Sequence, residues 1–139
     1  MTVATFKNTA PEFVAVVMAG TVGARLFPMT SPQHPKYMMP ICGVPVVFRL
    51  LRCLEASGFS ECVIAIAVDD NVTIPALQKE EGFVEVATTP NLVVQSVSKQ
   101  TKMKVTVLVL GDECPGSVEV LRQVEGSAAI PKSSNIVVF

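Results

Sequence analysis

Residues 13–40 read FVAVVMAGTVGARLFPMTSPQHPKYMMP, and this stretch decides the fold. Its apolar, β-branched beginning predicts a buried strand. Two glycines, Gly20 and Gly23, follow the strand, and Arg25 and Lys36 come after them. A glycine-bearing loop after a buried strand lets backbone N–H groups approach phosphate closely, and the two basic side chains supply positive charge. The stretch therefore predicts the layout of a nucleotide site.

The rest of the chain alternates strand-like and helix-like patterns, which is typical of a parallel α/β sheet. We expect a long loop over residues 20–40 that contains no helix, and we leave residues 83–102 open between strand and helix. For the helix after the second strand we expect Thr73 or Asn71 as the N-cap. The expected strands are residues 13–18, 61–68, 105–110 and 135–139, and the expected helices are residues 45–57 (ended by Gly58), 75–81 and 118–124. The fold class is therefore α/β, with a Rossmann-like, mostly parallel sheet and helices on both faces.

The amino-acid composition indicates a single domain that does not bind nucleic acid directly. The chain has 139 residues, enough for one domain, and is 50% hydrophobic but only 17% charged, against about 25% charged in ordinary soluble domains. Strands buried on both faces and a surface that meets a partner would account for this. The net charge of −1, with scattered basic residues, argues against direct binding of nucleic acid. No apolar run reaches the ~18 residues of a membrane span, so we expect a cytoplasmic protein with no membrane partner.

Residues that bind metals in other proteins are sparse here. No two cysteines form a C-x-x-C pair and the only histidine is His34, so we predict no zinc site and expect buried free thiols. Asp112 and Glu113 are adjacent in a turn, where side chains diverge, so we expect no metal there either. The four cysteines are Cys42, Cys53, Cys62 and Cys114.

Several motifs resemble the sugar-1-phosphate nucleotidyltransferase family. Residues 19–30 (AGTVGARLFPMT) are similar to its A-G-G-x-G-[ST]-R-L-x-P-L-T motif, and residues 35–40 (PKYMMP) to its P-K-P-x-x-P motif. Residues 114–121 (CPGSVEVL) are similar to its G-T-A-x-x-L segment. The resemblance implies a nucleotide-diphospho-sugar transferase fold, of which residues 13–139 are the N-terminal part and residues 1–12 a flexible segment. Because the chain stops in an expected strand, we expect it to be a fragment.

The resemblance also implies roles for five residues. Gly20, Gly23, Arg25, Lys36 and Gly116 would bind nucleotide. In an active protein Arg25 would stabilise the pyrophosphate leaving group and Lys36 would contact phosphate, with Mg²⁺ accompanying the nucleoside triphosphate.

Three departures from the motif argue against turnover. Thr21 replaces a glycine, and its Cβ hinders close approach of the backbone to phosphate. Ala24 replaces a hydroxyl residue and removes a donor. Tyr37 stands where the family has proline, so we expect the backbone of Lys36 to be less constrained. We therefore predict that no residue is catalytic. If the protein is active after all, Arg25 and Lys36 are the predicted catalytic residues.

Within the family the chain is most similar to the nucleotidyltransferase-like domains of the translation initiation factor 2B subunits, gamma first and epsilon as a close alternative. This resemblance implies a non-catalytic role in a guanine-nucleotide exchange complex for initiation factor 2. The partners would be the other subunits of that complex, with nucleotide as a further ligand. Two alternatives stay open: an active transferase that makes a nucleotide sugar, and a nucleotide-binding module without chemistry.

Overall fold

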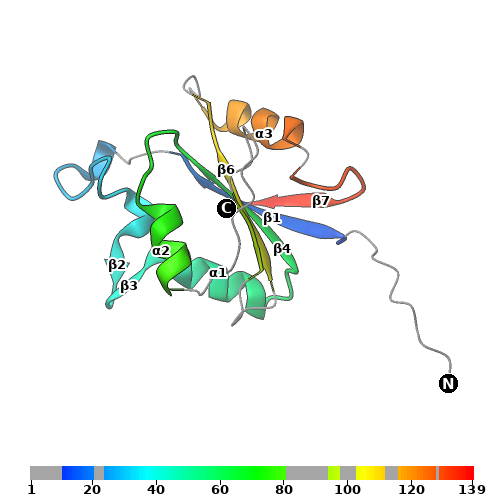
Figure 1. Ribbon diagram of the computed structural model, residues 1–139, viewed down its shortest axis with the longest axis horizontal. Coiled ribbons are helices and arrows are strands. Elements are labelled where there is room, and N and C mark those ends of the chain that lie inside the picture. Colours follow the sequence, from blue (N-terminus) through cyan, green and yellow to red (C-terminus); the bar gives the residue numbers. More distant parts are fainter. Residues whose placement is uncertain (1–10, 21–23, 81–93, 98–102, 112–115, 128) are drawn as a thin grey trace.

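The computed structural model describes residues 11–20, 24–80, 94–97, 103–111, 116–127 and 129–139 (Figure 1). In these residues a five-stranded sheet has the order β5-β6-β4-β1-β7. Neighbouring strands are parallel except for β5, which is antiparallel to β6 at one edge. The strands are β1 (Phe13–Ala19), β4 (Glu61–Ile66), β5 (Val94–Val97), β6 (Lys104–Val109) and β7 (Asn135–Val138). The predicted mostly parallel α/β sheet is confirmed.

Helices cover both faces of the sheet, as Figure 1 shows. Helices α1 (Val46–Ala56) and α2 (Thr73–Glu80) pack on one face, and α3 (Ser117–Gly126) packs on the other. Alternate residues of β1 point to opposite faces, so Ala15 and Val17 join the core under α1 while Val14 and Val16 join the core under α3. Both faces are buried, and this is why the strand reads as a continuous apolar run.

Helix α1 begins at Val46, one residue after the predicted first position Pro45, which is extended, and it ends at Ala56, two residues before the predicted cap Gly58. Pro45 precedes its first residue with φ −54°. At the other end Gly58 has a φ of +90°, its N–H donates to Glu55 O at 2.9 Å, and Phe59 N–H donates to Leu54 O at 3.1 Å. These two bonds form a Schellman motif, in which a left-handed glycine satisfies the last carbonyls of the helix. The predicted glycine cap is confirmed.

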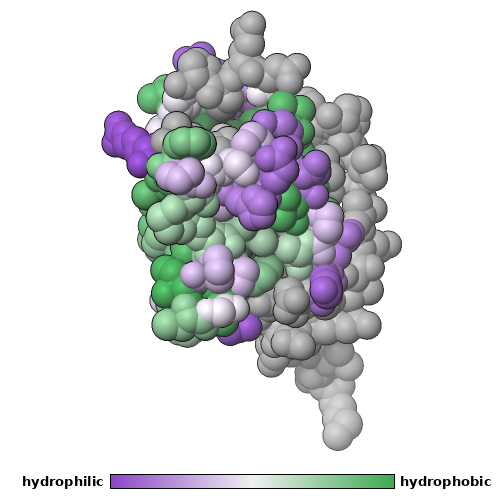
Figure 2. Space-filling model, turned by 90° about the vertical axis from the view of Figure 1, so that its left-hand side faces the viewer, coloured by the Kyte–Doolittle hydropathy of each residue, from purple (hydrophilic) through white to green (hydrophobic). Residues whose placement is uncertain are grey.

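The segment from residue 24 to residue 45 is more structured than predicted. It contains two 3₁₀ turns, η1 (Ala24–Leu26) and η2 (Lys36–Met38), and a small hairpin of β2 (Pro40–Ile41) and β3 (Val44–Pro45). The expectation of a loop without any helix is wrong at these turns, because single turns are too short to produce a periodic pattern. Figure 2 looks onto the side of the molecule where this segment lies, and hydrophobic side chains gather over much of that side.

Two further boundaries differ from the prediction. The second strand ends at Ile66 and not at Val68, because Ala67 already accepts the N–H of Asp70 in a turn, at 3.1 Å. Residues 94–97, in the stretch left open, form strand β5 by pairing with β6. The rest of that stretch, residues 83–93 and 98–102, lies outside the described residues.

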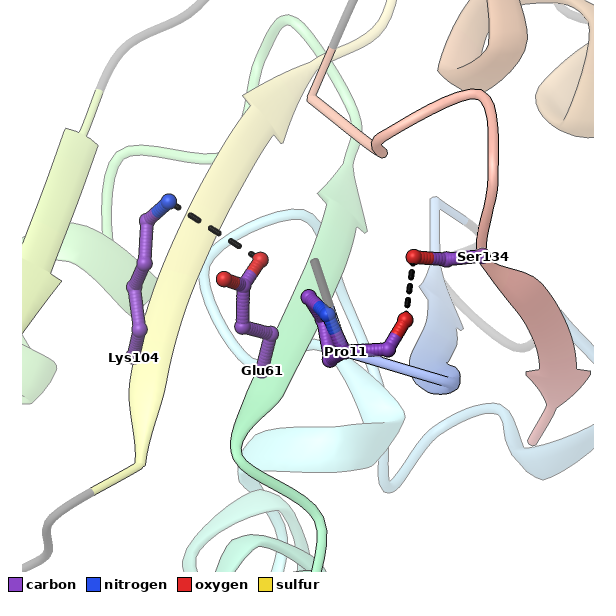
Figure 3. Close-up of polar contacts among 4 residues, drawn as sticks. All are labelled: Pro11, Glu61, Lys104 and Ser134. Atoms are coloured by element: carbon purple, nitrogen blue, oxygen red, sulfur yellow. Dashed lines mark hydrogen bonds and ion pairs between the residues drawn. The ribbon is translucent and has the colours of Figure 1, made fainter. Parts of the chain in front are cut away.

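The amino ends of the strands are tied together by polar contacts (Figure 3). Lys104 and Glu61 are partners in the β4–β6 register and form an ion pair at 3.8 Å. On the other side of the sheet, Ser134 Oγ donates to the carbonyl of Pro11, and Asn135 N–H donates to Glu12 O at 2.8 Å. Residues 11 and 12, predicted to be flexible, are thus bonded to the approach of β7, and residues 1–10 lie outside the described part. No helix in the described residues has the length and apolarity to cross a bilayer.

Candidate functional site

The candidate site lies at the carboxyl edge of the sheet. Strands β1, β4 and β6 run parallel, so the segments that leave them start at the same edge. Gly20 follows β1, the turn at Asp70 follows β4 and Gly111 follows β6. In open α/β sheets ligands bind at this edge, and Gly20, one of the predicted nucleotide residues, lies there.

Gly20 allows two segments to pack closely. A Cβ built on it would lie 2.6 Å from Leu110 Cδ1 and 4.0 Å from the carbonyl of Ala65. Its φ is outside the left-handed region, so no special backbone conformation demands a glycine there. The structure therefore gives Gly20 a packing role between β1 and the end of β6. Gly23, the second predicted glycine, lies outside the described residues.

Arg25 lies in η1, and its side chain is exposed. Among the described residues it forms no ion pair. The side chains that follow it are apolar and also exposed: Leu26, Phe27 (79% exposed) and Met29. The segment that carries them, light blue in Figure 1, lies on the side that faces the viewer in Figure 2. We call Leu26, Phe27 and Met29 the apolar loop surface; exposed apolar side chains are typical of protein contacts and not of a polyphosphate site.

Lys36 is exposed in η2, but the residues on either side of it are buried. Pro35 accepts the N–H of Met38 at 2.9 Å, and Lys36 O accepts the N–H of Met39 at 3.2 Å. Tyr37, only 8% exposed, belongs to the core under α1. The lysine side chain therefore extends from a short turn that is held by its neighbours.

Tyr37 contacts a polar cluster that sequence reasoning missed. Its hydroxyl donates to Oδ2 of Asp70, and Thr73 Oγ1 donates to the same oxygen at 2.7 Å. The other carboxylate oxygen, Oδ1, accepts the N–H groups of Val72 and Thr73 at 2.9 and 3.0 Å. Thr73 is completely buried. One carboxylate thus joins the Lys36 turn to the first turn of α2.

The pKa shifts in this cluster follow from burial and hydrogen bonding. Burial raises the pKa of Tyr37 well above its ordinary value, and the hydrogen bond to Asp70 raises it further. Burial also opposes ionisation of Asp70, but hydrogen bonds from Tyr37, Thr73 and Val72 outweigh it, so the pKa of Asp70 is lowered. The tyrosine is neutral and the carboxylate ionised at neutral pH, which is the arrangement that the hydrogen bond requires.

One prediction about this region is wrong. Neither Thr73 nor Asn71 caps α2, because the Asp70 carboxylate accepts the N–H groups of Val72 and Thr73, where the helix begins. The run Asp69-Asp70-Asn71 signalled a cap in this turn but did not distinguish its three members. Tyr37, which stands where the family has proline, is buried and hydrogen-bonded.

Gly116 is the residue before α3, at the N-cap position. Its φ of −176° and ψ of 173° are extended, and nothing lies within 4 Å of a Cβ built on it. A side chain would therefore fit, and no side chain caps the helix there. At the same edge the N–H of Gly111 donates to Gln123 Oε1 of α3 at 2.9 Å. The structure places Gly116 near this edge without giving a steric reason for glycine.

The described residues do not fit a magnesium ion. No group of three or more His, Cys, Asp or Glu among them is arranged to hold a metal. Asp70 lies at the right edge, but four hydrogen bonds already occupy its carboxylate. Asp112 and Glu113 lie outside the described residues. The described side chains therefore support no chemical step through Mg²⁺.

The described cysteines and the histidine form no candidate site. Cys62 is buried, and burial raises the pKa of its thiol to about 12. Cys42 and Cys53 are exposed free thiols, so the prediction of buried thiols is wrong for these two. Cys114 lies outside the described residues. His34 is an exposed loop residue whose N–H donates to Ser31 O at 2.9 Å.

The mostly parallel sheet with helices on both faces defines an α/β protein, and two solved structures share this fold. A putative glucose-1-phosphate thymidylyltransferase from Bacillus anthracis, solved with sucrose, has a TM-score of 0.62 at 14% identity and matches 91% of this chain and 43% of its own. HddC from Yersinia pseudotuberculosis has a TM-score of 0.58 at 22% identity and matches 80% of this chain and 40% of its own.

At these identities the two structures confirm the fold alone. The chain spans less than half the length of either. No family model and no curated protein matches the sequence.

Proposed function

We propose that the chain is the N-terminal part of a non-catalytic, nucleotidyltransferase-like domain that binds other subunits of a cytoplasmic translation initiation factor 2B complex, as its gamma or epsilon subunit. The observation that carries the proposal is the apolar loop surface of Leu26, Phe27 and Met29, next to Arg25. A site for a triphosphate needs donors and positive charge around the phosphates. Exposed apolar side chains are instead stabilised when a protein partner covers them.

The sequence of the glycine loop supports the same proposal. Thr21 and Ala24 replace the glycine and hydroxyl residue of the family motif, so the loop has fewer features that favour phosphate. The only described acidic side chain with a shifted pKa at this edge, Asp70, is engaged in structural hydrogen bonds. Both observations favour a domain that binds partners over a domain that catalyses a reaction.

Assembly with the other subunits tests the proposal. We expect the Phe27→Ser variant to weaken capture of the other initiation factor 2B subunits at least tenfold, because the ring is exposed and would be buried by a partner. Val118→Ser is the matched control, since Val118 is 73% exposed but lies on α3. The proposal fails if the wild-type protein captures no subunit, or if both variants weaken capture equally.

The second candidate is an active sugar-1-phosphate nucleotidyltransferase, for example one that makes an activated mannose or glucose. The exposed Lys36, held between buried neighbours at the carboxyl edge, is the observation that favours it. In this case Lys36 and Arg25 would bind phosphate, and a metal ion would accompany the triphosphate.

Pyrophosphate release tests this candidate. Incubation with a nucleoside triphosphate, Mg²⁺ and mannose or glucose 1-phosphate should release pyrophosphate, and Lys36→Ala should abolish the release. Absence of release together with thermal stabilisation by GTP or ATP would favour the third possibility, a nucleotide-binding module without chemistry, since a ligand that binds the native state stabilises it.

A further inference from the structure

We propose that Tyr37 is a positioning residue, which holds the turn that carries Lys36 by bonding its hydroxyl to the Asp70 carboxylate. The inference goes beyond the proposed function, because it concerns how the lysine is presented and not which molecule it meets. It rests on a contact that joins η2 to the turn after β4 and the adjoining first turn of α2, 33 residues later in the sequence.

The partner of Tyr37 is itself fixed. Asp70 Oδ1 accepts two backbone N–H groups, from Val72 and Thr73, and Asp70 N–H donates to Ala67 O. The carboxylate therefore cannot turn away without uncapping α2. A hydroxyl bonded to such an acceptor is held in place, whereas a bond to a free surface side chain would leave it mobile.

The tyrosine is anchored at two points. Its ring belongs to the core under α1, and its hydroxyl reaches the Asp70 carboxylate. A buried hydroxyl without a partner is unfavourable, so loss of the hydrogen bond would weaken the anchor even with the ring in place. Its raised pKa keeps the hydroxyl protonated and able to donate.

The consequence for Lys36 is geometric. Its backbone lies between buried Pro35 and buried Tyr37, and its carbonyl accepts the N–H of Met39. The backbone of Lys36 is thus held by a buried residue on each side and by the bond from Met39, while its side chain is exposed. A lysine presented in this way loses less freedom when it binds an anion than one on a loose loop.

Two variants test the proposal, and each lacks one of the two hydroxyl groups that donate to Oδ2 of Asp70. Tyr37→Phe removes the bond between η2 and Asp70 and keeps the ring, whereas Thr73→Val removes the bond between α2 and Asp70 and leaves the Tyr37 hydroxyl in place. We expect a similar small loss of thermal stability in both. Amide exchange at Met38 and Met39, the N–H groups that close η2, should become about three- to tenfold faster in Tyr37→Phe and stay unchanged in Thr73→Val.

Binding of inorganic tripolyphosphate gives the second readout. Tyr37→Phe should weaken binding several-fold, Lys36→Ala should weaken it more, and the double variant should bind no more weakly than Lys36→Ala alone, because the tyrosine acts through the lysine. Equal exchange at Met38 and Met39 in both hydroxyl variants would overturn the proposal, since a general loss of stability would then explain it. If Lys36→Ala binds tripolyphosphate like the wild type, the phosphate role of Lys36 fails, and the exchange measurement decides the role of Tyr37.

Discussion

Replacing Gly20 by alanine separates a packing role from a nucleotide role for this glycine. The new Cβ would lie 2.6 Å from Leu110 Cδ1, well inside ordinary contact distance. Leu110 is buried in the core under α3, and its N–H is bonded to Ile66 O at 2.9 Å, so its backbone cannot retreat freely. The end of the leucine side chain must therefore change position within a packed core.

The magnitude follows from two opposing effects. Overpacking a core costs about 1–3 kcal/mol. Replacing glycine by alanine at a compatible φ restricts the unfolded chain and restores about 0.4–1 kcal/mol. The φ of Gly20 is compatible, since it is outside the left-handed region. The net loss in the free energy of unfolding is therefore at most about 2.6 kcal/mol, and because the atom that must move is the end of a flexible leucine side chain we expect about 1 kcal/mol.

Urea denaturation of the wild type, the two single variants Gly20→Ala and Leu110→Val, and the double variant measures this effect. Leu110→Val removes the atom that the new Cβ would meet and should cost about 1 kcal/mol by itself. The double variant Gly20→Ala, Leu110→Val should be more stable than the sum of the two single changes predicts. Strict additivity, or a Gly20→Ala protein as stable as the wild type, would refute the packing argument and return Gly20 to the loop that binds nucleotide.

Three further outcomes follow from the structure. Because hydrogen bonds lower the pKa of Asp70, its contribution to stability is complete well above the ordinary pKa of about 3.9 and is lost as the pH falls through the lowered value. The free energy of unfolding should therefore fall less steeply with acid in Asp70→Asn than in the wild type, and identical pH profiles of the two proteins would contradict this. A thiol reagent should modify Cys42 and Cys53 in the native protein but Cys62 only after unfolding, and rapid native labelling of Cys62 would show that the core is open. Gly116→Ser should leave stability unchanged or raise it by a few tenths of a kcal/mol, because no side chain caps α3 and a Cβ fits; a loss above about 1 kcal/mol in thermal unfolding would show that glycine is required.

The framework of the fold was predictable because its signals are local. Strands buried on both faces produce uninterrupted apolar runs, as in residues 14–17 and 62–66. The ends of α1 were predictable because Pro45 and Gly58 each have a backbone preference that acts without tertiary contacts. A sheet order that places β1 between β4 and β7 agrees with the predicted class but is not determined by any single run.

The features that escaped prediction depend on partners that are distant in the sequence. Asp69, Asp70 and Asn71 are all suited to cap a helix, and nothing local distinguishes them. The choice of Asp70 coincides with a bond from Tyr37, 33 residues away. Residues 94–97 were ambiguous for a similar reason, because their strand conformation is completed by pairing with β6.

The pairing of β1 with β7 has a consequence for how the chain is made. Phe13 lies opposite Asn135, so β1 is translated more than a hundred residues before β7, the strand with which it pairs. Until then, one edge of β1 has no sheet partner on that side, while β4 can already pair on the other. Closing such a long loop is entropically costly and slow. During synthesis the unpaired edge of β1 and its apolar side chains are therefore exposed, and exposed segments of this kind are the ones that chaperones protect from aggregation.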